Sequence, residues 1–119
     1  MTRIAYVFSA LMAASPVLAD SPNIEDVRVE RGSMGWRFFV TISHPDSGWD
    51  HYADGWEILD ADGNRLGYRE LHHPHVDEQP FTRSLSDVVL PDGTQVVFVR
   101  TSCSVENWSG ALTRVEISY

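Results

Sequence analysis

LSDVVLPDGTQVVFV, residues 85–99, is the clearest structural signal in the chain. Two segments rich in β-branched residues are separated by Pro-Asp-Gly, a strong turn signal, so the stretch predicts two strands joined by a tight turn. Residues 96–99 are apolar at every position, which suits a strand near the middle of a sheet. We therefore expect a molecule built from strands.

The rest of the chain repeats this pattern of short alternating segments and turn residues, with no stretch of helical period. Residues 36, 38, 40 and 42, for example, are apolar and face one way, as in a half-buried strand. Seven strands are expected, within residues 24–31, 36–43, 56–59, 65–71, 81–90, 95–102 and 112–119. Seven short strands in about 100 residues predict an all-β fold, an immunoglobulin-like or fibronectin type III-like β-sandwich.

The N-terminus predicts export. Arg3 precedes an apolar run over residues 4–14, and small residues lead up to Ala19, as in a secretory signal peptide cleaved after Ala19. Pro16 and Asp20 interrupt the run short of the length that crosses a bilayer. We expect residues 1–19 to be a signal peptide and residues 20–119 a single periplasmic or secreted domain, with no membrane insertion after cleavage.

Charge and cysteine content narrow the function classes. Residues 20–119 contain 8 Arg and 17 acidic residues, because Arg3 lies in the predicted signal peptide. Their net charge is −9 with His neutral. Such a surface repels phosphate, so nucleic acid and anionic membrane are not expected partners. Cys103 is the single cysteine, so no disulfide can form within the chain. The core must stabilise the domain unaided, which is feasible at this size.

The expected topology gathers unusual residues at one end. Successive antiparallel strands put the second, fourth and sixth connections, residues 44–55, 72–80 and 103–110, at the same end of the sandwich. All five histidines, Cys103, Trp49 and Trp108 lie in or beside these loops. The other connections are ordinary turns. Loops at one end of a sandwich are where related architectures place binding residues.

The histidines predict a metal site. Imidazole, carboxylate and thiolate are the usual ligands of zinc and copper, and we expect one of these ions at His51, His73, His75 and Glu78. His72 and His44 are alternative donors from the same loops. The spacing matches no standard zinc-finger or zincin signature. The alternative is a polar loop whose histidines bond the backbone or stack on aromatic rings.

A second set of residues in the loops predicts recognition of a protein or a glycan. Aromatic rings can form a platform for a sugar or a side chain, and carboxylates can accept hydroxyl hydrogen bonds. The expected ligand-binding residues are Trp49, Asp50, Tyr52, Asp54 and Trp108. No catalytic residues are assigned, because a buried spectator thiol is the commoner state of a residue such as Cys103. We expect a binding protein and not an enzyme.

Several motifs carry a resemblance: residues 52–58 (YADGWEI), His73-Pro74-His75 and residues 78–85 (EQPFTRSL). They resemble those of a family of small exported bacterial proteins of unknown function, over most of residues 20–119. The resemblance implies an exported domain and a functional unit at His73, His75 and Glu78. Relatives often carry a histidine before the last strand, where this chain has SVENW, residues 104–108, so Glu106 or Cys103 would have to substitute.

Overall fold

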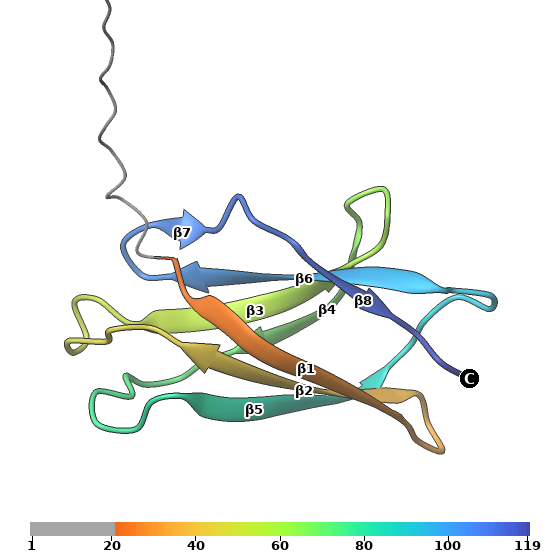
Figure 1. The fold of residues 1–119 in the computed structure, drawn as a ribbon, viewed down its shortest axis with the longest axis horizontal. Helices are drawn as coiled ribbons and strands as arrows, with labels where there is room; N and C mark the ends of the chain where they lie inside the picture. Colours follow the sequence, from red (N-terminus) through yellow and green to blue (C-terminus); the bar gives the residue numbers. More distant parts are fainter. Residues whose placement is uncertain (1–20) are drawn as a thin grey trace, which may run out of the picture.

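The computed structural model describes residues 21–119, so the predicted signal peptide, residues 1–19, lies outside the described part. Residues 21–119 contain strands and no helix, and the strands form two antiparallel sheets packed face to face (Figure 1). The expected all-β sandwich is confirmed. Within these residues no helix is long and apolar enough to span a membrane.

The first sheet has the order β1-β2-β5 and the second has the order β4-β3-β6-β7, with β8 also paired to β6. The strands are β1 (Asn23–Arg31), β2 (Trp36–Ser43), β3 (Ala53–Leu59), β4 (Arg65–Glu70), β5 (Phe81–Val88), β6 (Val96–Cys103), β7 (Asn107–Trp108) and β8 (Thr113–Glu116). The prediction of seven strands missed the two-residue β7, which pairs with the end of β6 inside a segment expected to be loop. A two-residue strand is too short to produce a period-2 signal.

The core lies between the sheets and follows the alternation of the strands. Phe38 and Val40 of β2 are fully buried, as are Trp56 and Ile58 of β3. In β6, where residues 96–99 are all apolar and the sequence alone does not show which face is buried, Val97 and Val99 face the core with no exposed surface. Because side chains on a strand alternate, Cys103 continues this inward face and is also fully buried.

The connections separate into two groups at opposite ends of the sandwich (Figure 1). At one end are tight turns in which Gly35, Gly63 and Gly93 adopt positive φ angles of 141°, 85° and 85°. At the other end are the three longer connections, residues 44–52, 71–80 and 104–112. The expected gathering of the histidine-bearing loops at one end is thus present in the structure.

Candidate metal site at the end of the core

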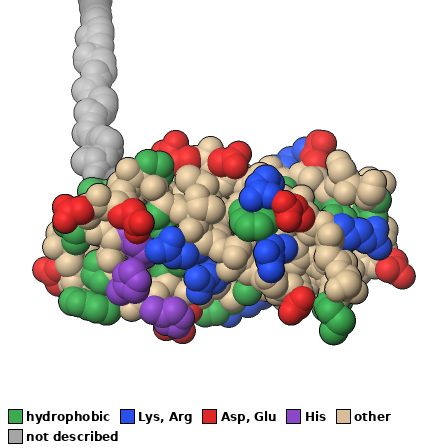
Figure 2. Space-filling view, turned by 90° about the horizontal axis from the view of Figure 1, so that it is seen from below, with side chains coloured by type: hydrophobic (Ala, Val, Ile, Leu, Met, Phe, Trp, Pro, Cys, Tyr) green, Lys and Arg blue, Asp and Glu red, His purple; other side chains and the backbone are tan. Residues whose placement is uncertain are grey.

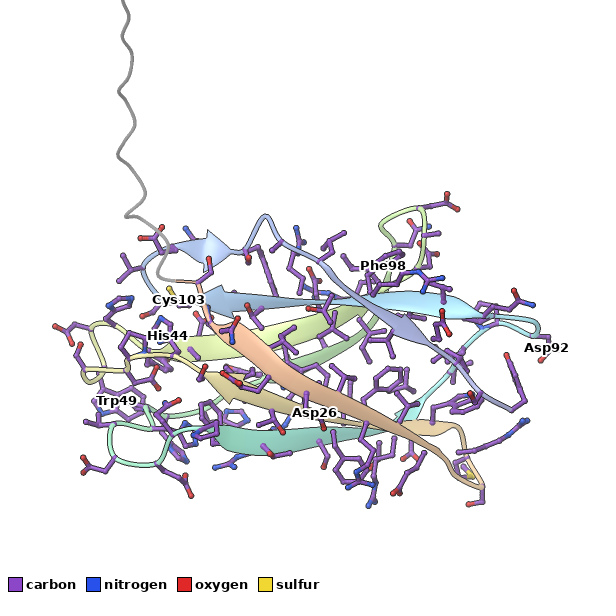
Figure 3. The ribbon with its side chains drawn as sticks, in the orientation of Figure 1. Asp26, His44, Trp49, Asp92, Phe98 and Cys103 are labelled. Atoms are coloured by element: carbon purple, nitrogen blue, oxygen red, sulfur yellow. The ribbon has the colours of Figure 1, made fainter. Side chains whose placement is uncertain are left out.

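Three potential metal ligands converge where the core meets the long loops: His44, His51 and Cys103. Their donor atoms, one ring nitrogen from each histidine and the sulfur, all lie within 4.8 Å of one another. His44 and Cys103 are buried and His51 is half-buried. Figure 3 shows His44 and Cys103 close together at the loop end of the sandwich. His44 follows β2 of one sheet and Cys103 ends β6 of the other, so the cluster bridges the two sheets.

His44 is held in one orientation by a buried carboxylate. Its Nδ1 lies 2.6 Å from Oδ1 of Asp46, and neither side chain has exposed surface. Since an ionised carboxylate can only accept, Nδ1 carries the proton and Nε2 carries the lone pair. Nε2 is buried and has no hydrogen-bond partner among the described residues. A buried lone pair of this kind is available to an ion.

His51 is positioned by a four-residue turn and Cys103 by strand pairing. The backbone N–H of His51 donates to the carbonyl of Gly48 at 3.1 Å, and the N–H of Ser47 donates to the carbonyl of His51 at 3.0 Å. Cys103 pairs with Ala53 at the start of β3, which brings the thiol beside the segment that carries His51. The rings of His44 and His51 meet edge to face, with centroids 4.9 Å apart.

The loops around the cluster are joined by side-chain hydrogen bonds. Oδ1 of Asp46 also accepts from the N–H of Ala53 at 2.9 Å, and Oδ2 accepts from the N–H of His75 at 2.8 Å. The side chain of Gln79 accepts from the N–H of His44 and donates to the carbonyl of His75. These bonds connect residues 44–53 with residues 75–79. The site therefore has a fixed framework and is not a chance meeting of mobile loops.

The predicted metal ligands are divided between two places. The structure brings His51 to His44 and Cys103, while His73, His75 and Glu78 lie together in the neighbouring loop. Among residues 21–119, no group of three donor atoms within 4.8 Å of one another contains His73, His75 or Glu78. Figure 2 shows the histidines visible on that face gathered at one end of the molecule. Metal binding by the predicted set remains a prediction.

His75 acts as a packed, hydrogen-bonded residue. Its ring stacks on Phe81 with a centroid distance of 3.8 Å and an interplanar angle of 9°. Its Nε2 lies 2.8 Å from the guanidinium of Arg83, which can only donate. Burial, together with the charge of Arg83, lowers the pKa of His75. The neutral ring is thus the form that the fold favours, and Nε2 already has a donor.

The predicted aromatic and acidic residues also separate into two places. Trp49 is 68% exposed and packs edge-on against Tyr52, with centroids 5.6 Å apart. Asp50, in the same turn, is exposed. Trp108 instead lies on β7, where it packs against Tyr68 and the guanidinium of Arg100.

Asp54 lies on β3, where its carboxylate accepts a hydrogen bond from the hydroxyl of Ser102. The tight pair is therefore Trp49 with Tyr52, and Asp54 and Trp108 belong to the neighbouring sheet surface.

From the sequence, His44 and Cys103 are expected only as alternative ligands. The alternation of side chains along β2 and β6 is the signal that could have identified them as ligands. His44 follows Ile42 on the inward face of β2, and Cys103 follows Thr101 on the inward face of β6. Polar, ligating side chains that continue a buried apolar face are unusual. Of the two residues proposed to replace the histidine of relatives, Cys103 lies in the cluster, whereas Glu106 is exposed and its N–H donates to the Cys103 sulfur at 3.2 Å.

Comparison with known proteins gives one point of reference. The chain is 40% identical over 89 residues to a protein of Halomicrobium mukohataei named "Putative lipoprotein". The matched segment covers 74% of this chain and 43% of that protein, so the chain spans less than half the length of this relative. No protein-family model matches the chain, and no solved structure matches it.

Proposed function

We propose that this protein is an exported domain that binds a copper or zinc ion at His44, His51 and Cys103. The observation that carries the proposal is the convergence of two imidazole nitrogens and one sulfur within 4.8 Å, at a largely buried position. Imidazole and thiolate are the donors that copper and zinc share. The proposed role is binding, in keeping with the expectation from the sequence.

The spacing of the donors supports binding with little rearrangement. Three atoms at the corners of an equilateral triangle of 4.8 Å side lie about 2.8 Å from its centre. Metal bonds to nitrogen and sulfur are about 2.0–2.3 Å long, so each donor has to move inward by about 0.5–0.8 Å at most. Movements of this size require rotation of side chains only.

The surroundings of His44 also support the proposal. Histidine ligands in metal sites donate their second ring N–H to a carboxylate or carbonyl, which fixes the tautomer and raises the basicity of the ligating nitrogen. Asp46 accepts this hydrogen bond from His44 Nδ1, and both side chains are fully buried. A purely structural His–Asp pair does not require the remaining nitrogen to be buried beside a second histidine and a thiol.

Export is supported by two separate features. The N-terminal residues have the composition of a signal peptide. The related protein of Halomicrobium mukohataei carries the name "Putative lipoprotein", which is compatible with export. The net negative charge of the chain disfavours binding of nucleic acid, whose phosphates are held by basic residues.

Titration of the metal-free protein with Zn²⁺ and, under reducing conditions, Cu⁺ tests the proposal. We expect one ion per chain with submicromolar affinity, and at least a 100-fold loss of affinity in His44→Ala and Cys103→Ser. His73→Ala, in the neighbouring loop, should bind as tightly as the unaltered protein. Loss of binding in His73→Ala with retention in His44→Ala would move the site to the second loop and contradict the proposal.

A second candidate function is recognition of a protein or glycan by the aromatic turn. The observation that favours it is the 68% exposure of Trp49, held edge-on by Tyr52 beside the exposed carboxylate of Asp50. Exposed tryptophans stack on sugar rings and on side chains of partners. Binding of an oligosaccharide panel that quenches tryptophan fluorescence, and that is lost in Trp49→Ala but kept in Cys103→Ser, would favour this function.

A further inference from the structure

We infer that the ion at His44, His51 and Cys103 is copper and that the protein holds it in both oxidation states, as a one-electron carrier. The inference rests on the proposed function and adds the identity of the metal and the role of the bound ion. Three features of the site carry it: the number and type of the donors, the isolation of the single thiol, and the fixed framework around the ligands.

The donor set favours copper over zinc. Structural zinc sites are closed by four protein ligands, whereas among residues 21–119 the cluster contains three His, Cys, Asp or Glu donors. Two histidines and one cysteine in a trigonal arrangement are the donor set typical of copper centres that transfer electrons. The general order of affinities for divalent ions also places Cu²⁺ above Zn²⁺ at a given nitrogen and sulfur site.

The isolation of Cys103 allows the oxidised state to persist. Cu²⁺ oxidises accessible thiols to disulfides, and this reaction consumes two thiols for two electrons. The chain has one cysteine, and its side chain is fully buried, so a second thiol cannot reach it. The thiolate is therefore able to remain a ligand of Cu²⁺. A protein that merely stores Cu⁺ has no need of this protection.

The framework suits an ion that changes charge without changing place. Asp46 accepts three hydrogen bonds, from the ring of His44 and from the N–H groups of Ala53 and His75. The N–H of Glu106 donates to the sulfur of Cys103 at 3.2 Å, a contact that stabilises negative charge on sulfur. Hydrogen bonding at the cysteine sulfur is one of the features that set the potential of such copper sites.

The electron balance is simple. Cu²⁺ bound to two neutral imidazoles and one thiolate takes one electron from a one-electron donor and becomes Cu⁺ with the same ligands. No proton moves, because Asp46 keeps its bond to Nδ1–H of His44 in both states. His51 is the most exposed of the three ligands, so its ring offers the shortest path to a donor or acceptor at the loop end of the molecule. The natural partner is accordingly another one-electron redox carrier.

Loading the metal-free full chain with one equivalent of Cu²⁺ tests the inference. We expect an intense visible absorption band from charge transfer between sulfur and copper, and an electron paramagnetic resonance signal from one Cu²⁺ per chain. Reduction by ascorbate should abolish both, and ferricyanide should restore both with one electron per copper. Gel filtration after each step should show that at least nine-tenths of the copper stays bound.

Two variants make the result specific. Cys103→Ser should lose the charge-transfer band while keeping the circular dichroism of the folded chain. Met34→Leu removes an exposed thioether at the opposite end of the molecule, which could bind copper adventitiously, and should leave band, signal and stoichiometry unchanged. An equal band in Cys103→Ser would contradict the inference.

The remaining outcomes separate the inference from the proposed function. Retention of Zn²⁺ against an equimolar amount of copper, or release of copper on every redox cycle, overturns the inference but leaves a metal-binding protein. Failure of the folded chain to bind either ion overturns both.

Discussion

At the scale of single residues, Asp46 is the centre of the loop end. Its two carboxylate oxygens satisfy the ring of His44 and two backbone N–H groups, from Ala53 and His75, without any contact with solvent. A buried carboxylate is stabilised only when hydrogen bonds of this kind replace its hydration. The residue thus serves the fold and the proposed metal site through the same bonds.

The substitution Asp46→Asn tests both roles. In Asp46→Asn an NH₂ group replaces one of the two accepting oxygens, so one buried donor loses its acceptor. We therefore expect a loss of about 2 kcal/mol in the free energy of unfolding. The affinity for the metal should fall by roughly 10–100-fold, since the orientation of His44 is no longer enforced. Urea denaturation and metal titration of the same sample measure the two effects.

Asp77→Asn is the matched control, because Asp77 is an exposed aspartate in a loop at the same end. Its stability should change by no more than about 0.5 kcal/mol, as for other surface substitutions. Equal metal affinity in Asp46→Asn and the unaltered protein would mean that the carboxylate does not orient a ligand.

His75 predicts a pH dependence of stability. The fold lowers its pKa, chiefly through burial and then through Arg83, so the unfolded chain binds a proton more readily than the folded one. The stabilisation is complete above the usual pKa of imidazole and is lost as the pH falls below it. Urea midpoints of the metal-free protein, measured from about pH 8 to about pH 5.5, should therefore decrease.

The variant His75→Gln assigns this dependence. It is less stable at high pH because it loses the stacking on Phe81, but its midpoint should fall less steeply with decreasing pH than that of the unaltered protein. Parallel curves for the two proteins would show that other groups cause the dependence.

At the scale of elements, the turn between β1 and β2 is locked against the end of β5. Gly35 has a φ of 141°, and a Cβ built on it would lie 2.7 Å from the carbonyl oxygen of Val88. Gly93, in the turn between β5 and β6, has a φ of 85°, and a Cβ there would have no atom within 4 Å. The two glycines share a positive φ but differ in their surroundings, which makes them a matched pair.

We expect Gly93→Ala to cost about 1–2 kcal/mol, the strain of a side chain at positive φ. Gly35→Ala should cost at least about 2 kcal/mol more, because its methyl group meets backbone that cannot rotate away. Chemical denaturation of both variants checks the difference. Equal losses would mean that the turn between β1 and β2 shifts freely against β5.

At the scale of the whole molecule, a bound metal ion would cross-link the two sheets. His44 directly follows β2 of one sheet and Cys103 ends β6 of the other, at the end of the core that carries the long loops. Unfolding separates these residues, so the ion binds the folded chain in preference to the unfolded one. Binding should therefore raise the stability of the entire sandwich.

Thermal denaturation with and without metal measures this effect. A free ion concentration of 100 times Kd adds about 2.7 kcal/mol. For a domain of this size, that shifts Tm upward by on the order of 10 °C. Cys103→Ser should show no comparable shift, and His73→Ala should show all of it. A shift of similar size in Cys103→Ser would indicate binding outside the bridging cluster.

The sandwich and its loop end could be predicted from the sequence because both follow from local patterns. The alternation in residues 36–42, the turn signal at Pro91-Asp92-Gly93 and the spacing of the segments determine where strands begin and end. Antiparallel succession then places alternate connections at the same end. The burial of Trp56 follows from this pattern, whereas the choice of Val97 and Val99 as the buried face of β6 does not.

The choice of ligands could not be predicted, because distances between loops depend on how the sheets pack. His73 and His75 are close together in the sequence, yet His75 stacks on Phe81 and forms a hydrogen bond with Arg83. His44 and Cys103 are 59 positions apart in the sequence, and only the packing of β2 against β3 and β6 brings them to His51.

Secondary structure and polarity are properties of neighbours along the chain, so the sequence by itself determined an acidic all-β domain with its histidines at one end. Donor distances of a few ångströms result from side chains that belong to different sheets. The tertiary structure alone therefore decided which histidines face the thiol.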